Sequence, residues 1–90
     1  MKLDDALYNW LQIRIVADAR PHDRSALDTA AFFQDILSED HQVSDLQYKK
    51  EGDAYWLQCV TGGTQTSRRY DAEAVESLLN AIQSEPRYNQ

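Results

Sequence analysis

The segment Ala54–Val60, AYWLQCV, constrains the fold of this chain more than any other stretch, because it is apolar on both sides of a strand. Gln58 is its only polar residue. Side chains alternate between the two faces of a sheet, so Trp56 and Val60 would lie on one face of this strand. The opposite face would carry Tyr55, Leu57 and Cys59. A sheet with helices on one face alone typically has a polar second face, so the presence of Trp56 there needs an explanation.

Two arrangements would account for the face that carries Trp56. In the first, an N-terminal helix with a broad apolar surface, which includes Trp10, Ile13 and Ile15, covers this face of the sheet. In the second, the face contacts another molecule, either a different protein or a second copy of this chain. The sequence leaves both arrangements open, and they imply different functions.

Alternation of apolar and polar residues predicts three short antiparallel strands between Val43 and Tyr70. Two turn signals flank the central strand, Glu51–Gly52–Asp53 on one side and Gly62–Gly63 on the other. Turns this short join antiparallel neighbours, so the three strands are expected to form a meander.

Apolar residues at helical spacing predict a first helix over about 4–19. The alternation of Leu11, Ile13 and Ile15 also fits a strand, but no turn residue interrupts the segment and acidic residues suit its start. Pro21 ends this helix, because the residue before a proline disfavours helical geometry.

A second helix is expected to begin at a capping box formed by Ser25 and Asp28, or alternatively at Asp23, and to end near Ser38. A third helix follows Asp71, which is expected to cap it. Its apolar positions recur at the spacing of a single helix face, and they are Val75, Leu78, Leu79 and Ile82.

The predicted class is therefore α+β, with the order α-α-β-β-β-α and a three-stranded antiparallel meander packed with helices. With 90 residues, the chain is expected to form one domain over 1–85. The segment 86–90 is expected to be a C-terminal tail that either is disordered or packs back through Tyr88. No apolar run is long enough to span a membrane and the start does not resemble a signal peptide, so we expect a cytoplasmic protein without membrane contact.

The sequence contains no pattern that indicates catalysis, a cofactor or a metal site. It has no G-x-S-x-G turn and no phosphate-binding glycine loop, and Cys59 is its only cysteine. Asp18, His22 and Asp23 lie before the second helix, whereas His41 follows it, and a helix of about 15 residues separates the two groups by roughly 22 Å. We therefore expect no enzyme activity, and we interpret the segment DARPHDR, 18–24, as a corner between two helices.

Basic residues gather in the only part of the chain that is not acidic. The net charge is −6, yet segment 43–70 contains four basic and three acidic residues. In a meander, the end of the first strand and the end of the third lie at the same edge of the sheet. Adding the aromatic residues of that region gives these candidate binding residues: Lys49, Lys50, Tyr55, Trp56, Arg68, Arg69 and Tyr70.

These observations favour a small protein that acts by protein–protein binding, as a regulator or adaptor, with itself or another protein as the partner. The alternative is binding of RNA or another nucleic acid through Lys49, Lys50, Arg68 and Arg69, which the overall negative charge opposes. The α-β-β-β-α order over 25–82 is similar to that of double-stranded RNA-binding domains. That family has a lysine cluster at the start of its last helix, where acidic residues stand in this chain, so the function of that family is not expected here.

Overall fold

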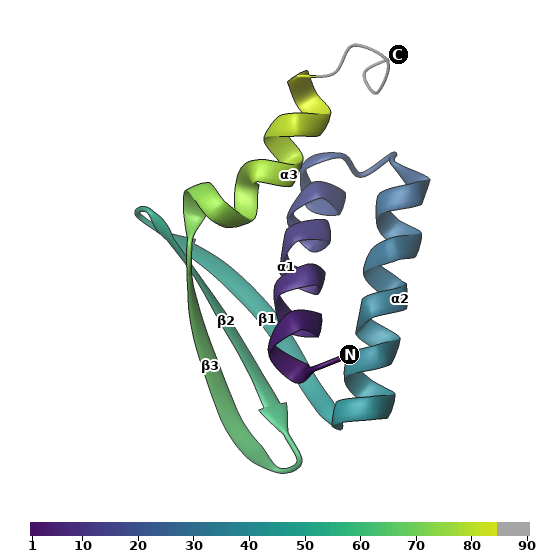
Figure 1. Cartoon of the computed structure of the whole chain (residues 1–90), viewed down its shortest axis with the longest axis vertical. Helices are drawn as coiled ribbons and strands as arrows, with labels where there is room; N and C mark the ends of the chain where they lie inside the picture. Colours follow the sequence, from purple (N-terminus) through teal and green to yellow (C-terminus); the bar gives the residue numbers. More distant parts are fainter. Residues whose placement is uncertain (85–90) are drawn as a thin grey trace.

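Three helices and a three-stranded antiparallel sheet follow one another along the chain in the predicted order (Figure 1). The computed structural model describes residues 1–84. The elements are α1 (Leu3–Ala19), α2 (Arg24–His41), β1 (Val43–Glu51), β2 (Ala54–Thr61), β3 (Thr64–Asp71) and α3 (Ala72–Ser84). The predicted α+β class and element order are confirmed, whereas the predicted tail, 86–90, lies outside the described residues.

The sheet is the predicted meander, with the strand order β1-β2-β3. Gly62 and Gly63 both have positive φ, 56° and 86°, as the two central residues of a type I′ hairpin require. Gly52, with φ of 59°, opens the turn between β1 and β2. Near its start, β1 contains an irregularity between Ser44 and Gln47, where the pairing register with β2 shifts.

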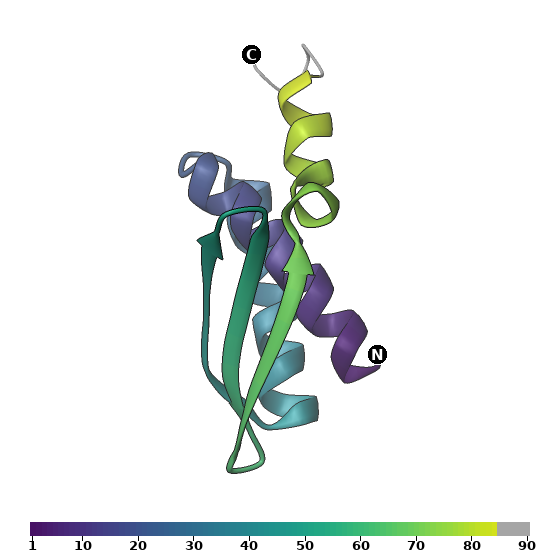
Figure 2. The same ribbon diagram turned by 90° about the vertical axis from the view of Figure 1, so that its left-hand side faces the viewer.

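All three helices lie on the same side of the sheet, and Figure 2 looks at the side that they leave uncovered. Of the two arrangements that the sequence left open, the one in which the N-terminal helix covers the face bearing Trp56 is therefore not the one adopted. The core instead contains Leu7, Trp10 and Leu11 of α1 together with the opposite face of β2. Two ring contacts confirm this packing, since Tyr8 lies 5.7 Å from Tyr70 and Trp10 lies 6.1 Å from Tyr48, measured between ring centroids.

The broad apolar surface of α1 is explained by its central position, because α1 lies between the sheet and α2 (Figure 1). One part of this surface contacts the strands, and another contacts α2. The C-terminal half of α1 adds a second cluster, in which Val16 and Ala17 pack with Ala26 of α2. Leu78, Leu79 and Ile82 of α3 also contact this cluster.

The helices begin and end close to the positions predicted from their capping residues, and α2 differs from its prediction in two details. Asp23 caps α2 by accepting a 3.0 Å hydrogen bond from the Ala26 amide, so the alternative at Ser25 is not the one used. The helix also continues to His41, three residues beyond the predicted end, because Gln42 adopts the left-handed conformation with φ of 55° and its N–H bonds to the Leu37 carbonyl. Asp71 caps α3 as predicted, accepting a 3.3 Å bond from the Ala74 amide.

Candidate functional site

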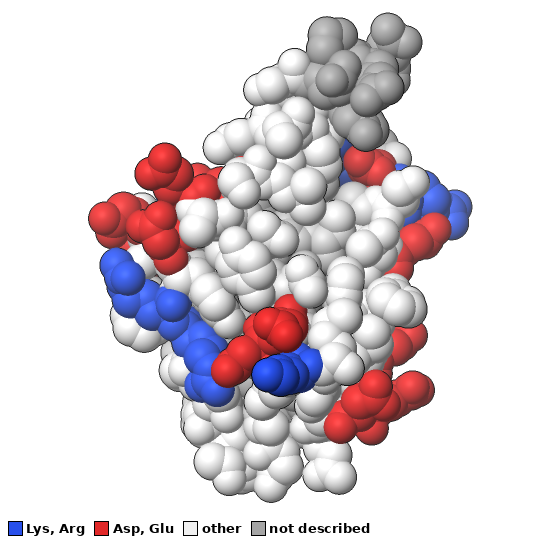
Figure 3. Space-filling view, viewed as in Figure 1, with Lys and Arg blue, Asp and Glu red and all other residues white. Residues whose placement is uncertain are grey.

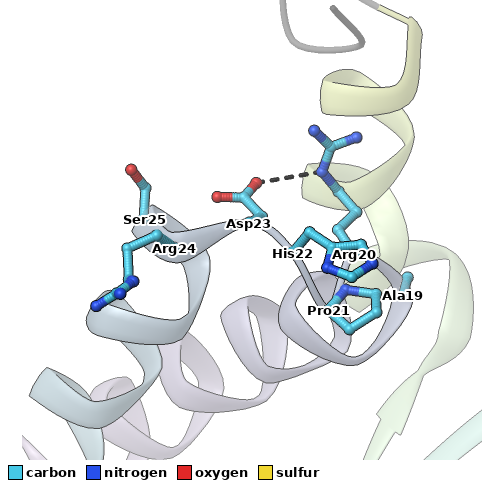
Figure 4. A pocket seen from close by; sticks show the side chains of 7 residues that line it. All are labelled: Ala19, Arg20, Pro21, His22, Asp23, Arg24 and Ser25. Atoms are coloured by element: carbon cyan, nitrogen blue, oxygen red, sulfur yellow. Dashed lines mark hydrogen bonds and ion pairs between the residues drawn. The ribbon is translucent and has the colours of Figure 1, made fainter.

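The segment 18–24 forms a corner, and residues 19–25 line a shallow hollow of about 600 Å³ there, shown in Figure 4. Both carboxylate oxygens of Asp23 accept hydrogen bonds within the fold. One oxygen caps α2, and the other accepts a 3.2 Å bond from Arg20 Nε. The bond from the Ala26 amide holds the pKa of Asp23 below its ordinary value. His41 is at the far end of α2, where its ring contacts the Met1 carbonyl at 2.8 Å.

Metal ligands do not gather at this corner. Across residues 1–84, no group of three or more His, Cys, Asp and Glu side chains lies close enough together to hold a metal ion. Asp18 points instead toward the sheet, where it accepts a hydrogen bond from the Tyr48 hydroxyl and pairs with Arg14 at 2.8 Å. The corner connects two helices, and within it Arg20 pairs with Asp23.

The four basic residues of the predicted binding edge are divided between the two faces of the sheet. Lys50 and Arg68 lie on the face that the helices cover, where Lys50 pairs with Glu76 at 2.9 Å and Arg68 pairs with Asp4 at 3.3 Å. Lys50 therefore connects the sheet to α3, and Arg68 connects it to α1. The other two basic residues, Lys49 and Arg69, lie on the uncovered side.

Tyr55 and Tyr70, two further candidates, also lie on the covered face. Tyr55 is only 6% exposed, and its hydroxyl donates a 2.5 Å hydrogen bond to Glu76. Burial, together with this carboxylate, raises the pKa of Tyr55 to about 12. Burial likewise raises the pKa of Tyr70, whose ring contacts Tyr8 of α1. Both tyrosines belong to the contact between sheet and helices.

Lys49, Trp56 and Arg69 form one row across the uncovered side of the sheet. Trp56 of β2 is the register partner of Lys49 on β1 and of Arg69 on β3. The Trp56 side chain is partly exposed, and both cations are exposed. We call this side of the sheet the open face, and by register it consists of Ser44, Gln47, Lys49, Glu51, Ala54, Trp56, Gln58, Val60, Gln65, Ser67, Arg69 and Asp71.

Both cations of the row around Trp56 have a carboxylate close by. Lys49 pairs with Glu51 at 3.0 Å and Arg69 pairs with Asp53 at 3.8 Å, both at the turn between β1 and β2. Asp53 is 92% exposed, so water screens its pair strongly, and exposed pairs of this kind contribute about 0 to 1 kcal/mol. Figure 3, which has the view of Figure 1 and so sees the open face from its edge, shows Lys and Arg over the sheet with Asp and Glu beside them.

A second concave feature, which sequence reasoning missed, lies beside the free edge of β1. This edge cleft has a volume of about 340 Å³ and is lined by Trp10, Arg14, Gln34, Leu46, Gln47 and Tyr48. Its residues come from α1, α2 and β1, so no local spacing in the sequence connects them. Trp10 has the pattern of an ordinary core residue, and only the fold places its indole against this cleft.

Comparison with known proteins adds no functional information, since the sequence matches no family model and no curated protein or solved structure matches it. Within residues 1–84, none of the helices has the length and apolar character needed to cross a membrane. The function must therefore be argued from the open face.

Proposed function

We propose that this protein is a non-catalytic cytoplasmic binding protein, a regulator or adaptor, that docks through its open face onto an acidic segment of another protein. One observation supports this proposal above the others. Trp56 is partly exposed between two cations, Lys49 and Arg69, on a sheet face that no helix within 1–84 covers.

Trp56 has the properties of an anchor for a protein partner. Tryptophan and arginine are enriched among the residues that dominate binding energy at protein interfaces. A partner that covers Trp56 would remove its remaining apolar surface from water, which stabilises the complex. The flanking polar residues, Gln47, Gln58 and Ser67, can supply hydrogen bonds at the rim of such an interface.

Charge complementarity argues for an acidic partner. Lys49 and Arg69 now contact Glu51 and Asp53, but these exposed pairs are weak and can exchange for carboxylates of a partner without a large cost. With a net charge of −6, most of the remaining surface would repel an acidic segment. The open face would therefore determine both the place and the orientation of docking.

A second candidate function is binding of single-stranded nucleic acid at the same place. An aromatic ring on an open sheet between two cations can stack on a base while the cations contact phosphates. The division of the basic residues weakens this alternative, because Lys50 and Arg68 are paired on the covered face.

A titration followed by nuclear magnetic resonance distinguishes these functions. The indole N–H signal of Trp56 and the backbone amides of β1, β2 and β3 are followed while a synthetic peptide of alternating Glu and Leu is added. The proposal predicts saturable shifts on the open face that weaken as salt is added. Oligouridylate of matched charge serves as the second arm, and sedimentation over a range of protein concentrations tests self-association.

Each other outcome contradicts the proposal. Shifts with oligouridylate alone would support the nucleic-acid function. A concentration-dependent dimer that protects Trp56 would show that the open face binds a second copy. If neither ligand shifts the open-face signals and the protein stays monomeric, the open face is not a docking surface for an acidic segment.

A further inference from the structure

The outward side of α2 carries the most exposed aromatic ring of the described chain. Phe32 is 59% exposed, whereas each of the other aromatic residues within 1–84 is buried or only partly exposed. Its ring stands edge-on to that of Phe33, with 5.4 Å between the two centroids. Phe33 and Ile36 pack against the main core, so Phe32 extends that core to the surface. We call these three residues the α2 patch.

Carboxylates surround the α2 patch on the surface of the helix. Asp28, Asp35 and Glu39 lie four residues before, three after and seven after Phe32, so all three share its side of α2. Their side chains are exposed, and the ion pairs within residues 1–84 involve none of them. The stretch 25–40 of this helix also contains no Lys or Arg. The α2 patch therefore has an apolar centre and an acidic rim.

This arrangement is unfavourable in the free protein, and bound cations would relieve it. Asp35 and Glu39 are neighbours at i and i+4, and like charges at this spacing destabilise a helix. The exposed ring of Phe32 also leaves apolar surface in water. A guanidinium can pair with these carboxylates, and it can also lie on the face of a phenylalanine ring, which attracts cations. Arginine beside an apolar side chain therefore matches the α2 patch in both charge and polarity.

The α2 patch and the open face lie on opposite sides of the molecule. In Figure 1 the sheet lies to the left of α1 and α2 lies to its right, and Figure 2 shows α2 behind the sheet. The two surfaces also differ in charge, because the row around Trp56 contains Lys49 and Arg69. Binding at one surface therefore leaves the other exposed, and each surface has an aromatic residue whose signals report on it.

We infer that the α2 patch is a second docking surface, which binds a basic segment of another protein with Phe32 as the anchor and the carboxylates of its rim as partners for arginine. Charge complementarity determines the choice of partner. Because this surface is separate from the open face, the inference does not depend on the proposed function. A second copy of the chain would offer cations through Lys49 and Arg69 of its open face, so the test includes self-association.

The test is a titration of the full chain with a synthetic peptide of alternating Arg and Leu, followed by nuclear magnetic resonance. The ring of Phe32 and the backbone amides of 28–39 report on the α2 patch, and the indole N–H of Trp56 reports on the open face. The inference predicts saturable shifts at the α2 patch that weaken as salt is added, while the Trp56 signal stays in place. A peptide of equal length with Gln in place of Arg is expected to shift neither set of signals.

The anchor is tested with two exposed apolar residues of the same helix. Phe32→Ala is expected to weaken binding of the Arg and Leu peptide by about tenfold, the effect of losing an anchor residue at an interface. Leu27 is also exposed, but it lies five residues away and so on another side of α2. Leu27→Ala is therefore the matched control and should leave the affinity unchanged.

The acidic rim is tested with two double substitutions that change the net charge equally. Asp35→Asn with Glu39→Gln removes two carboxylates beside the α2 patch and is expected to weaken binding by about fivefold, the effect of two exposed ion pairs. Asp5→Asn with Glu73→Gln removes two exposed carboxylates of α1 and α3. This second pair should weaken binding by less than about twofold, because it changes only the charge of the chain as a whole.

The outcomes separate this inference from the proposed function. If the basic peptide leaves the α2 signals in place while the Glu and Leu peptide shifts Trp56, the second surface is wrong and docking on the open face stands. Equal weakening by both double substitutions, or full binding by Phe32→Ala, would show that the basic peptide responds to net charge alone. A concentration-dependent assembly in sedimentation that both Phe32→Ala and Lys49→Glu abolish would show that a second copy occupies the α2 patch, which overturns the assignment of a basic segment.

Discussion

The hydroxyl of Tyr55 and the carboxylate of Glu76 are joined by a 2.5 Å hydrogen bond that connects the central strand to α3. The same carboxylate oxygen accepts a 2.9 Å bond from Lys50 Nζ. These two donors stabilise the ionised carboxylate, so the pKa of Glu76 is held below its ordinary value of 4.5. Three residues from three elements thus fix the start of α3 against the sheet.

Replacing Glu76 tests this connection. Glu76→Gln is expected to lower the free energy of unfolding by about 1 kcal/mol at neutral pH, because hydrogen bonds to a charged group are replaced by weaker ones. A lowered pKa stabilises the fold above pH 4.5, and this contribution is lost as the pH falls through the pKa of the folded state. Urea unfolding of both proteins should therefore show a difference that shrinks in acid.

The control for this substitution is Glu39→Gln, which removes an exposed carboxylate of α2. It should leave the unfolding free energy and its acid dependence close to those of the unsubstituted protein. A constant difference between Glu76→Gln and the original protein from neutral pH to well below pH 4.5 would contradict the assigned role of the charge.

The tyrosines of the covered face predict a loss of stability in alkali. The pKa of Tyr55 is raised to about 12 from an unfolded value of 10.0, so its contribution is complete below pH 10 and is lost as the pH rises toward 12. Tyr55→Phe should therefore flatten the decline of unfolding free energy over this range. The test is urea unfolding at several alkaline pH values, and an unchanged slope in Tyr55→Phe would contradict the prediction.

Two neighbouring positions at the start of α2 should differ sharply. Asp23→Ala removes the side chain that caps the helix and is expected to cost about 1 kcal/mol. Ser25→Ala, two residues later, changes a position that does not cap the helix and should change stability by less than about 0.5 kcal/mol. Thermal unfolding of the two variants gives the comparison. Equal losses would show that the capping box predicted from the sequence contributes after all.

Adjacent residues of β2 should respond according to the face on which they lie. Leu57 is fully buried, so Leu57→Ala leaves a cavity in the core and is expected to cost about 3 kcal/mol. Trp56→Ala should cost less than half as much, because water can occupy the space on the open face. Chemical unfolding measures both values. A larger loss for Trp56→Ala would show that Trp56 belongs to a covered core.

The order and limits of the elements followed from the sequence because local signals agree with the final packing. Glycine turns, alternation in the strands and the caps at Asp23 and Asp71 are all short-range features. The end of α2 differed because a left-handed residue at Gln42 extended the helix through polar residues. The placement of α1 could not be predicted, because a broad apolar surface fits both a covering helix and a central one.

The candidate site followed from the sequence only in part. The meander predicted that the four basic residues lie at one edge of the sheet, but it did not indicate which of them share a face with Trp56, or that Lys50 and Arg68 pair with carboxylates on the helices. Those partners, Glu76 and Asp4, are far away in the sequence. The edge cleft could not be predicted for the same reason, because its lining residues come from three elements that are far apart in the sequence.

The most direct test of the open face is a comparison of charge reversals by calorimetric titration with the Glu and Leu peptide. Lys49→Glu with Arg69→Glu reverses the row around Trp56, and Lys2→Glu with Arg24→Glu makes the same change of net charge on exposed residues elsewhere. The account predicts that the first pair abolishes binding and that the second weakens it by less than about threefold. Equal weakening by both pairs, or binding that survives reversal at Lys49 and Arg69, would contradict docking on the open face.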